Sequence, residues 1–385
     1  MRHERQNHYY GNRGAGSFAD HWLTIQPCLF DFLEDEVGEL DEEQRLFVRV
    51  AESLELERIA ARYGWCGNGR KPSSRLAIFK LLLMKHVWNW PETKDALGEV
   101  RRPPALRRLC GWETRGDIPS ESTVSRAFAE FALDRTADDL LARFVGRIFE
   151  GRIVIHRSID STETDARERP ATGDEKAEAA KTAAIRAQVE ANAGDLNALS
   201  LQKGRDAETN LSLLPALCDW GCKRNSKGRT QFWRGRKLHI AVADGDIPIA
   251  ACLTSASVHD PRAAIPLMQK ADAAALSLYD LGDAAYDAGE IREFSEANGH
   301  AAIIDANPRR GGPKPDCRGE RFVRIIPAEK VRFRNRSGVE RVNGHLHDAH
   351  GGRTVRVRGH AKVFLHLLLG LLVIAVEQAS AAMLR

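Results

Sequence analysis

The sequence lacks the features that mark disulfide-stabilised and zinc-stabilised proteins. Its seven cysteines are odd in number, widely scattered, and include no CxxC pair. This pattern fits free thiols in a reducing compartment better than a disulfide framework. Cys218 and Cys222 have a spacing that could begin a zinc site, but no matching second pair follows them.

The sequence also lacks a secretory signal and a long apolar run. Residues 1–16 are polar and basic, and we expect them to be disordered. The apolar segment KVFLHLLLGLLVIAVEQ (362–378) is interrupted by His366 and Gly370 and falls short of the ~20 residues that a membrane span needs. We therefore expect a buried helix there, no membrane partner, and a location in the bacterial cytoplasm or nucleoid.

Net charge is small, at +4, but the basic residues are concentrated locally. They gather in residues 223–239, 309–324 and 351–362. Such clusters typically contact phosphates without reading the base sequence. With 385 residues, 43% hydrophobic and 29% charged, the chain predicts a soluble globular protein of two domains.

The first part of the chain predicts a helical domain. After a tail at 1–20, residues 21–150 show helical periodicity, clearest over 74–88, 92–100 and 122–149. The segment after Pro119 begins like a helix and could be the second helix of a helix-turn-helix or an ordinary bundle helix. DNA-reading candidates on this domain are Arg101, Arg102, Arg107, Arg108 and Arg126.

From residue 151 the pattern becomes mixed α/β, and we assign residues 151–380 to one domain. The expected order is a strand ending at Asp160, a hairpin over 232–257 turning at Asp244-Gly245, a helix, a strand ending near Asp283, a helix closed by Gly299, a short strand and a closing helix. Two insertions interrupt this order. Residues 166–210 read as a loose helix or disorder, and residues 305–330 as a basic loop.

The segment VRFRNRSGVERVNGHLH (331–347) is polar but spaced like a helix. At 100° per residue, Phe333, Arg336 and His347 all lie within roughly 40° of Glu340. An aromatic ring, a cation, a carboxylate and an imidazole would share one stripe. By itself, this pattern is equally typical of a surface helix with an i,i+4 ion pair.

Three acids occupy positions that can converge. Asp160 and Asp283 end neighbouring strands, whose carboxyl ends meet at one sheet edge, and a flanking helix can add Glu340. Three carboxylates this close repel one another unless divalent cations bind between them. Mg²⁺ and Mn²⁺ are the expected cations, because they prefer oxygen ligands. Other acids compete for these roles. They are Glu163 and Asp165 near the first strand, and Asp280 and Asp287 near the second.

These three segments resemble the signatures of bacterial insertion-sequence transposases of the DDE type. SIDSTET resembles the family's first-aspartate strand, LGDAAYDAGEI its second-aspartate motif, and residues 331–347 its Tyr-x2-Arg-x3-Glu-x6-Lys signature. WRGRKLHIAVADGDIPIAACLTSASVHD and GGRTVRVRGHAKVFLHLLLGLL resemble its inner strands and closing segment. Phe333 stands where Tyr is usual, and His347 stands where Lys is usual. Phe333 lacks a hydroxyl that could contact a phosphate, and His347 is a weaker base than Lys. We therefore expect weaker phosphate binding here than in the family's usual signature.

The resemblance implies an RNase H-like mixed sheet flanked by helices, preceded by an all-α domain. It implies that Asp160, Asp283 and Glu340 bind two Mg²⁺ or Mn²⁺ ions. Water would attack the phosphodiester at the transposon end, and the freed 3′-OH would then attack target DNA. The implied partners are double-stranded terminal inverted repeats and target DNA, with at least a homodimer on DNA.

Several side chains are candidates for holding that DNA. They are Arg336, His347, Lys237, His239, Trp233, Arg234, Arg236, Arg356 and Arg358. Trp233, with Phe232, could stack on an unpaired base or form the core of the hairpin. Lys237 and His239 alternate with apolar residues and share one strand face.

Two other functions remain open on the sequence alone. An RNase H-like nuclease would cut DNA without joining it. A DNA-binding regulator derived from a transposase would keep the acids but not use them. Joined DNA products and the effect of Asp283→Ala would discriminate these readings.

Overall fold

The computed structural model describes residues 38–63, 72–190, 198–224, 229–307 and 327–383. The chain divides into two compact units, residues 1–41 and 42–385. Every element discussed below belongs to the second unit. The predicted tail at 1–20 and most of the basic loop at 305–330 lie outside the described residues.

The predicted helical part is all helix where it is described. Its helices are α2 (Glu42–Ser53), α3 (Glu57–Arg62), α4 (Arg75–Val87), α5 (Thr93–Val100), α6 (Pro104–Cys110), α7 (Glu121–Leu133) and α8 (Thr136–Ile148). The periodic segment 122–149 forms two helices, because Arg135 adopts a left-handed backbone with φ of 54° between α7 and α8. In α7, Val124, Ala127 and Phe131 are buried while Arg126 is exposed, so its apolar face serves the core.

Six strands form one mixed sheet. They are β1 (Val154–Asp165), β2 (Asp219–Arg224), β3 (Thr230–Ala243), β4 (Ile247–Ser255), β5 (Ser277–Gly282) and β6 (Ala301–Ile304). The order is β2-β3-β1-β5-β6, with β4 also paired to β3. β1, β5 and β6 are mutually parallel, whereas β2, β3 and β4 pair antiparallel. The predicted hairpin is confirmed as β3 and β4, with Gly245 at a φ of 78° in its turn.

The first strand is longer than predicted. It continues five residues beyond Asp160, because its second half pairs with β3 from Ser158↔Val242 to Asp165↔Gly235. Its parallel pairing with β5 ends earlier, at Ser158↔Leu281. Asp160 therefore lies inside a strand, just beyond the point where β5 stops.

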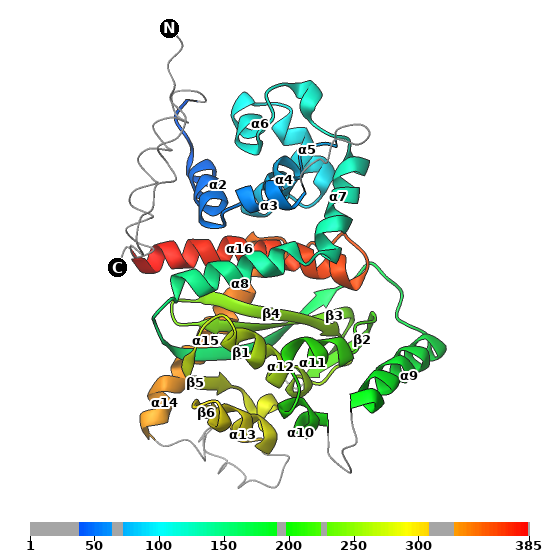
Figure 1. Cartoon of the computed structure of the whole chain (residues 1–385), viewed down its shortest axis with the longest axis vertical. Helices are drawn as coiled ribbons and strands as arrows, with labels where there is room; N and C mark the ends of the chain where they lie inside the picture. Colours follow the sequence, from blue (N-terminus) through cyan, green and yellow to red (C-terminus); the bar gives the residue numbers. More distant parts are fainter. Residues whose placement is uncertain (1–37, 64–71, 191–197, 225–228, 308–326, 384–385) are drawn as a thin grey trace. The chain divides into compact units, whose positions relative to one another are not determined.

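Helices cover the sheet on both sides (Figure 1). The helices after the hairpin are α12 (Pro261–Asp272) and α13 (Gly289–Ala297), as predicted, and Gly299 closes α13 at a φ of 78°. The described residues of the insertion at 166–210 include three helices, α9 (Gly173–Glu190), α10 (Ala198–Lys203) and α11 (Ala207–Leu213). From residue 327 on, within the last part of the predicted basic loop, come α14 (Pro327–Phe333), α15 (Ser337–Ala349) and α16 (His360–Met383).

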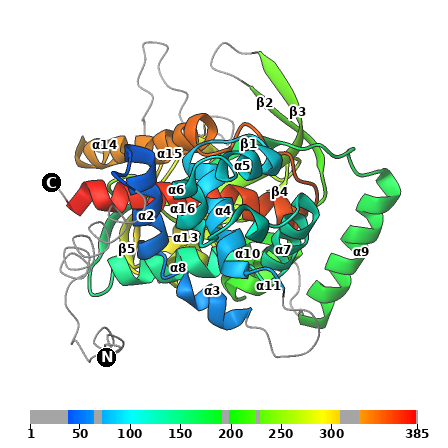
Figure 2. The same ribbon diagram turned by 90° about the horizontal axis from the view of Figure 1, so that it is seen from above.

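Helix α16 is the centre of the unit. It packs against β4 and against α2, α4, α7, α8 and α15 (Figures 1 and 2). At 24 residues it is longer than predicted, and by length and composition it could cross a membrane. Its apolar window is 83% buried by the protein itself, which is the condition of a core helix.

Candidate active site

The strand register places Asp160 and Asp283 at the same level of the sheet. Ser158 pairs with Leu281 in the parallel β1–β5 ladder. Asp160 and Asp283 each follow two residues later, and Asp283 keeps an extended backbone with φ of −77° and ψ of 178°. Since side chains alternate with a period of two, both carboxylates leave the sheet on the same side as their paired predecessors.

The electrostatics of these two acids are coupled. Burial raises the pKa of Asp160 to about 7, and the charge of Asp283 raises it further. The Ser161 backbone N–H, which donates to Asp160 at 2.8 Å, acts in the opposite direction. Burial likewise raises the pKa of Asp283, although its carboxylate accepts from the Ala285 N–H at 2.9 Å. Two largely buried acids, each with its pKa raised by burial and by nearby negative charge, are typical of functional sites.

The segment that carries Glu340 is not one continuous α-helix. Residues 334–336 form a 3₁₀ turn between α14 and α15. The predicted stripe nevertheless holds, because the Arg336 guanidinium lies 5.9 Å from the Phe333 ring centre and forms an ion pair with Glu340. Phe333 packs against the buried Leu281 and Ile303. The ring therefore secures this segment against β5, which leads into Asp283, and against β6.

Glu340 and Arg336 belong to the same electrostatic site as the two aspartates. The charge of Glu340 contributes to the raised pKa of Asp283, after the larger effect of burial. The charge of Arg336 acts in the opposite direction and lowers the pKa of both Asp160 and Asp283. The side chain of Glu340 is 54% exposed, so it is the member of the set that faces solvent.

The competing acids are occupied elsewhere or exposed. Asp280 is buried in an ion pair with Arg157, which is fully buried. The Asp287 carboxylate accepts from Arg292 at 3.1 Å. Glu163 pairs with Lys223 at 2.8 Å. Asp165, on the same strand as Asp160, is exposed.

Sequence reasoning missed two residues of this site, Asp260 and Tyr286. Asp260 accepts from Ser161 Oγ and from Lys237 Nζ, each at 3.0 Å, and its charge raises the pKa of Asp160 and Asp283. The signal was its position before Pro261 at the start of α12. Burial raises the pKa of Tyr286 well above its usual value, and the charges of Asp260 and Asp160 add to that. Within the described part of the chain, its buried hydroxyl has no hydrogen-bond partner.

Two predicted DNA contacts are contradicted by burial. His239 is fully buried, and its Nε2 lies 2.9 Å from Thr254 Oγ1. Arg236 is buried in a bidentate pair with Glu168, with N–O distances of 2.9 and 3.1 Å. Arg236 and His239 lie on opposite faces of β3, and both positions are covered by protein.

The other predicted contacts divide into engaged and exposed residues. Trp233 is buried and donates to the Arg236 carbonyl, whereas the neighbouring Phe232 is 69% exposed. Lys237 is held by Asp260 and by the Val258 carbonyl at 2.9 Å. His347 Nε2 lies 2.9 Å from Thr162 Oγ1, and burial lowers its pKa. Arg234, Arg356 and Arg358 are exposed.

The donor set fits hard divalent cations. Its members offer carboxylate oxygens, which Mg²⁺ and Mn²⁺ prefer. A buried acid with its pKa raised to about 7 gains stability when a cation offsets the neighbouring charge. In the described structure, the carboxylate oxygens of these three acids do not all lie within 4.8 Å of one another.

Comparison with known proteins gives two matches to family models. Residues 156–376 match a transposase DDE domain, and residues 35–130 match a transposase domain (DUF772). The first match spans more than half of the chain and contains all three acids. No curated protein and no solved structure gives a significant match.

Proposed function

Since the chain belongs to the transposases with a DDE domain, we propose that it cuts phosphodiesters at transposon ends and joins the freed 3′-OH to target DNA. Asp160, Asp283 and Glu340 are the proposed catalytic acids and would hold two Mg²⁺ or Mn²⁺ ions. When bound, these ions would activate the attacking oxygen and stabilise the leaving oxygen. The observation that carries the proposal is the register that levels Asp160 with Asp283, together with the raised pKa of both carboxyls.

The protein's own side chains prepare this site for an anionic substrate. The Phe333 and Leu281 contact fixes the segment that presents Arg336 and Glu340. Arg336 partly offsets the charge of the acids and, once cations take over that role, its fork is free to bind phosphate oxygens. Lys237 and Asp260 form a further ion pair, and Asp260 accepts a hydrogen bond from Ser161, the residue next to Asp160. Positioning and charge neutralisation are what in-line phosphoryl transfer chiefly requires.

We propose that double-stranded DNA lies across the exposed basic side chains. These are Arg234 on β3 and Arg356 and Arg358 in the segment before α16, with exposed Phe232 available to stack on an unpaired base. In this proposal, residues 21–150 form the domain that recognises the terminal repeats. Residues 151–380 form the domain that cuts and joins DNA. Pairing of two ends requires at least a dimer on DNA, and the activity belongs in the bacterial cytoplasm, on the nucleoid.

The test is a strand-transfer assay with the full chain, Mg²⁺ and DNA that carries the element's ends. We expect covalently joined products with wild-type protein. Asp283→Asn should lower both cleavage and joining by at least about 1000-fold, the scale of loss when one member of a catalytic unit is removed. DNA binding should persist. Asp165→Asn, an exposed acid on the strand of Asp160, is the matched control and should keep wild-type activity.

The same assay separates the alternatives. Cut but unjoined DNA would support a nuclease without strand transfer. Wild-type protein that binds ends but neither cuts nor joins them, with Asp283→Asn behaving identically in the cell, would support a non-catalytic regulator. Either outcome would overturn the proposed function.

A further inference from the structure

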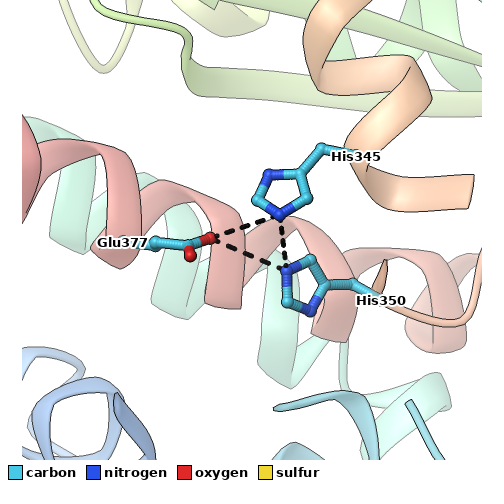
Figure 3. Close-up of side chains that lie close together, drawn as sticks. All are labelled: His345, His350 and Glu377. Carbon is cyan, nitrogen blue, oxygen red and sulfur yellow. Dashed lines mark hydrogen bonds and ion pairs between the residues drawn. The ribbon is translucent and has the colours of Figure 1, made fainter. Parts of the chain in front are cut away.

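A second cluster of ligand-type side chains lies on α15 and α16, apart from the three acids. His345 belongs to α15, His350 follows directly after this helix, and Glu377 belongs to α16 (Figure 3). The two imidazole Nε2 atoms lie 3.2 Å apart. Glu377 Oε2 lies 3.5 Å from His345 Nε2 and 3.7 Å from His350 Nε2. Three potential ligand atoms thus face a common point.

The proton positions favour a ligand role for His350. Its Nδ1 lies 2.9 Å from the His86 carbonyl oxygen, which can only accept, so Nδ1 carries the proton. Nε2 then presents its lone pair to the cluster. A metal-ligating histidine commonly has its other nitrogen fixed by such a carbonyl. His350 is 4% exposed, so this orientation is held inside the protein.

The carboxylate supplies a second, independent indication. Glu377 Oε2 is buried, has no hydrogen bond of normal geometry within the described residues, and has only long ion-pair contacts to His345 and His350, at 3.5 and 3.7 Å. It points at the two Nε2 atoms (Figure 3). A cation bound between the three atoms would satisfy this oxygen.

The distances match one kind of coordination. Ligands at about 2.0–2.1 Å from tetrahedral zinc are separated from one another by roughly 3.3–3.4 Å. The three observed separations, 3.2, 3.5 and 3.7 Å, bracket this value. We propose that His345, His350 and Glu377 bind one Zn²⁺ or a similar transition-metal ion, with water as the fourth ligand. Two imidazoles and one carboxylate select such metals over Mg²⁺.

The proposed ion would fasten the end of α15 to α16. The segment around His350 also bonds to α4, through reciprocal contacts in which His86 Nδ1 lies 3.0 Å from the His350 carbonyl. Glu340 lies in the first turn of α15, and the cluster lies at its other end. The site is therefore distinct from the catalytic acids, and its role is to hold the helix that carries one of them.

The test uses the full chain, purified, stripped with a chelator, and titrated with Zn²⁺ and with Co²⁺ as an optical probe. We expect the wild type to bind one Co²⁺ with a tetrahedral visible spectrum that Zn²⁺ abolishes. His345→Ala and Glu377→Gln should weaken Zn²⁺ binding at least about 100-fold, because loss of supporting groups alone costs 10–100-fold. Both side chains are partly exposed, so these variants should fold, which circular dichroism checks.

His347→Gln is the matched control for metal binding. It removes a histidine from the same helix, but this residue bonds to Thr162 instead. Its Zn²⁺ affinity should equal that of the wild type. Wild-type protein that binds no Zn²⁺ at micromolar free metal, or binding unchanged in folded His345→Ala and Glu377→Gln, would overturn the proposal. The imidazole pair would then be an ordinary hydrogen bond.

Discussion

Phe333 and His347, which replace the Tyr and Lys usual in related signatures, have packing and hydrogen-bonding roles in this chain. Phe333 contacts Leu281 and Ile303 beneath the site, and His347 bonds to Thr162 on the strand of Asp160. Burial lowers the pKa of His347, which keeps it neutral at physiological pH. The stripe thus retains one fixed cation, Arg336, for phosphate.

Restoring the cation tests this account. His347→Lys should tighten binding to transposon-end DNA, and the slope of log K against log salt should become steeper by about one. A salt titration of binding by fluorescence anisotropy measures both. His347→Gln, which stays neutral, should leave the slope unchanged. Equal slopes for Lys and Gln variants would show that position 347 does not reach phosphate.

A buried histidine on β3 makes stability depend on pH. Burial lowers the pKa of His239 from its ordinary 6.5 to about 4. Between these values the unfolded chain binds a proton that the folded chain does not, so stability is present above pH 6.5 and is lost as pH falls towards 4. The slope from this group is at most about 1.4 kcal/mol per pH unit.

The variant His239→Gln removes this titration. We expect it to be less stable than the wild type at pH 7, because it disturbs a buried site, but to lose less stability per pH unit between 6.5 and 4. Urea unfolding at several pH values measures the difference. Parallel pH profiles for the two proteins would contradict the assignment.

At the scale of elements, the β1–β3 ladder determines where Asp160 lies. A close backbone approach makes this ladder sensitive at Gly235, where an added Cβ would lie 1.9 Å from the Thr164 carbonyl oxygen. Gly235 pairs with Asp165 and Asp219 and so joins three strands. Only glycine permits this approach without displacing β1.

Gly235→Ala should therefore destabilise the protein by about 1–3 kcal/mol, the usual range for overpacking. The midpoint of urea unfolding should decrease accordingly. Gly289→Ala, in the first turn of α13, is the control, since an added Cβ there meets no atom within 4 Å. Equal midpoints for the two variants would show that β1 shifts at no cost.

At the scale of the whole molecule, α16 makes residues 42–385 one compact unit. It contacts helices from the predicted N-terminal domain and strand β4 of the catalytic sheet. Leu369 and its apolar neighbours on α16 are completely buried, as the core of such a unit requires. The helical part and the sheet should therefore share one cooperative unfolding transition.

Leu369→Ala should lower the free energy of unfolding by about 2–5 kcal/mol, through lost burial and a residual cavity. Amide hydrogen exchange should report loss of protection in α4 and α8 as well as in β4. Leu133→Ala removes the same atoms from a side chain that is 77% exposed and should have little effect. Lost protection confined to β4 would mean that the two parts unfold separately.

The sequence by itself predicted the hairpin, the buried closing helix and the order β1, β3, β4, α12, β5, α13 and β6, although not β2, and it nominated three acids as candidates. It could do so because periodicity, turn residues and motif spacing are local properties of the chain. Only the tertiary structure decided that β1 continues past Asp160, that Arg236 and His239 face the interior, and that Asp260 joins the acids. It also brought His345 and His350 against Glu377. These outcomes depend on pairing between segments that are distant in the sequence. Whether a side chain is buried depends on which segment packs against it, and not on the residue type alone.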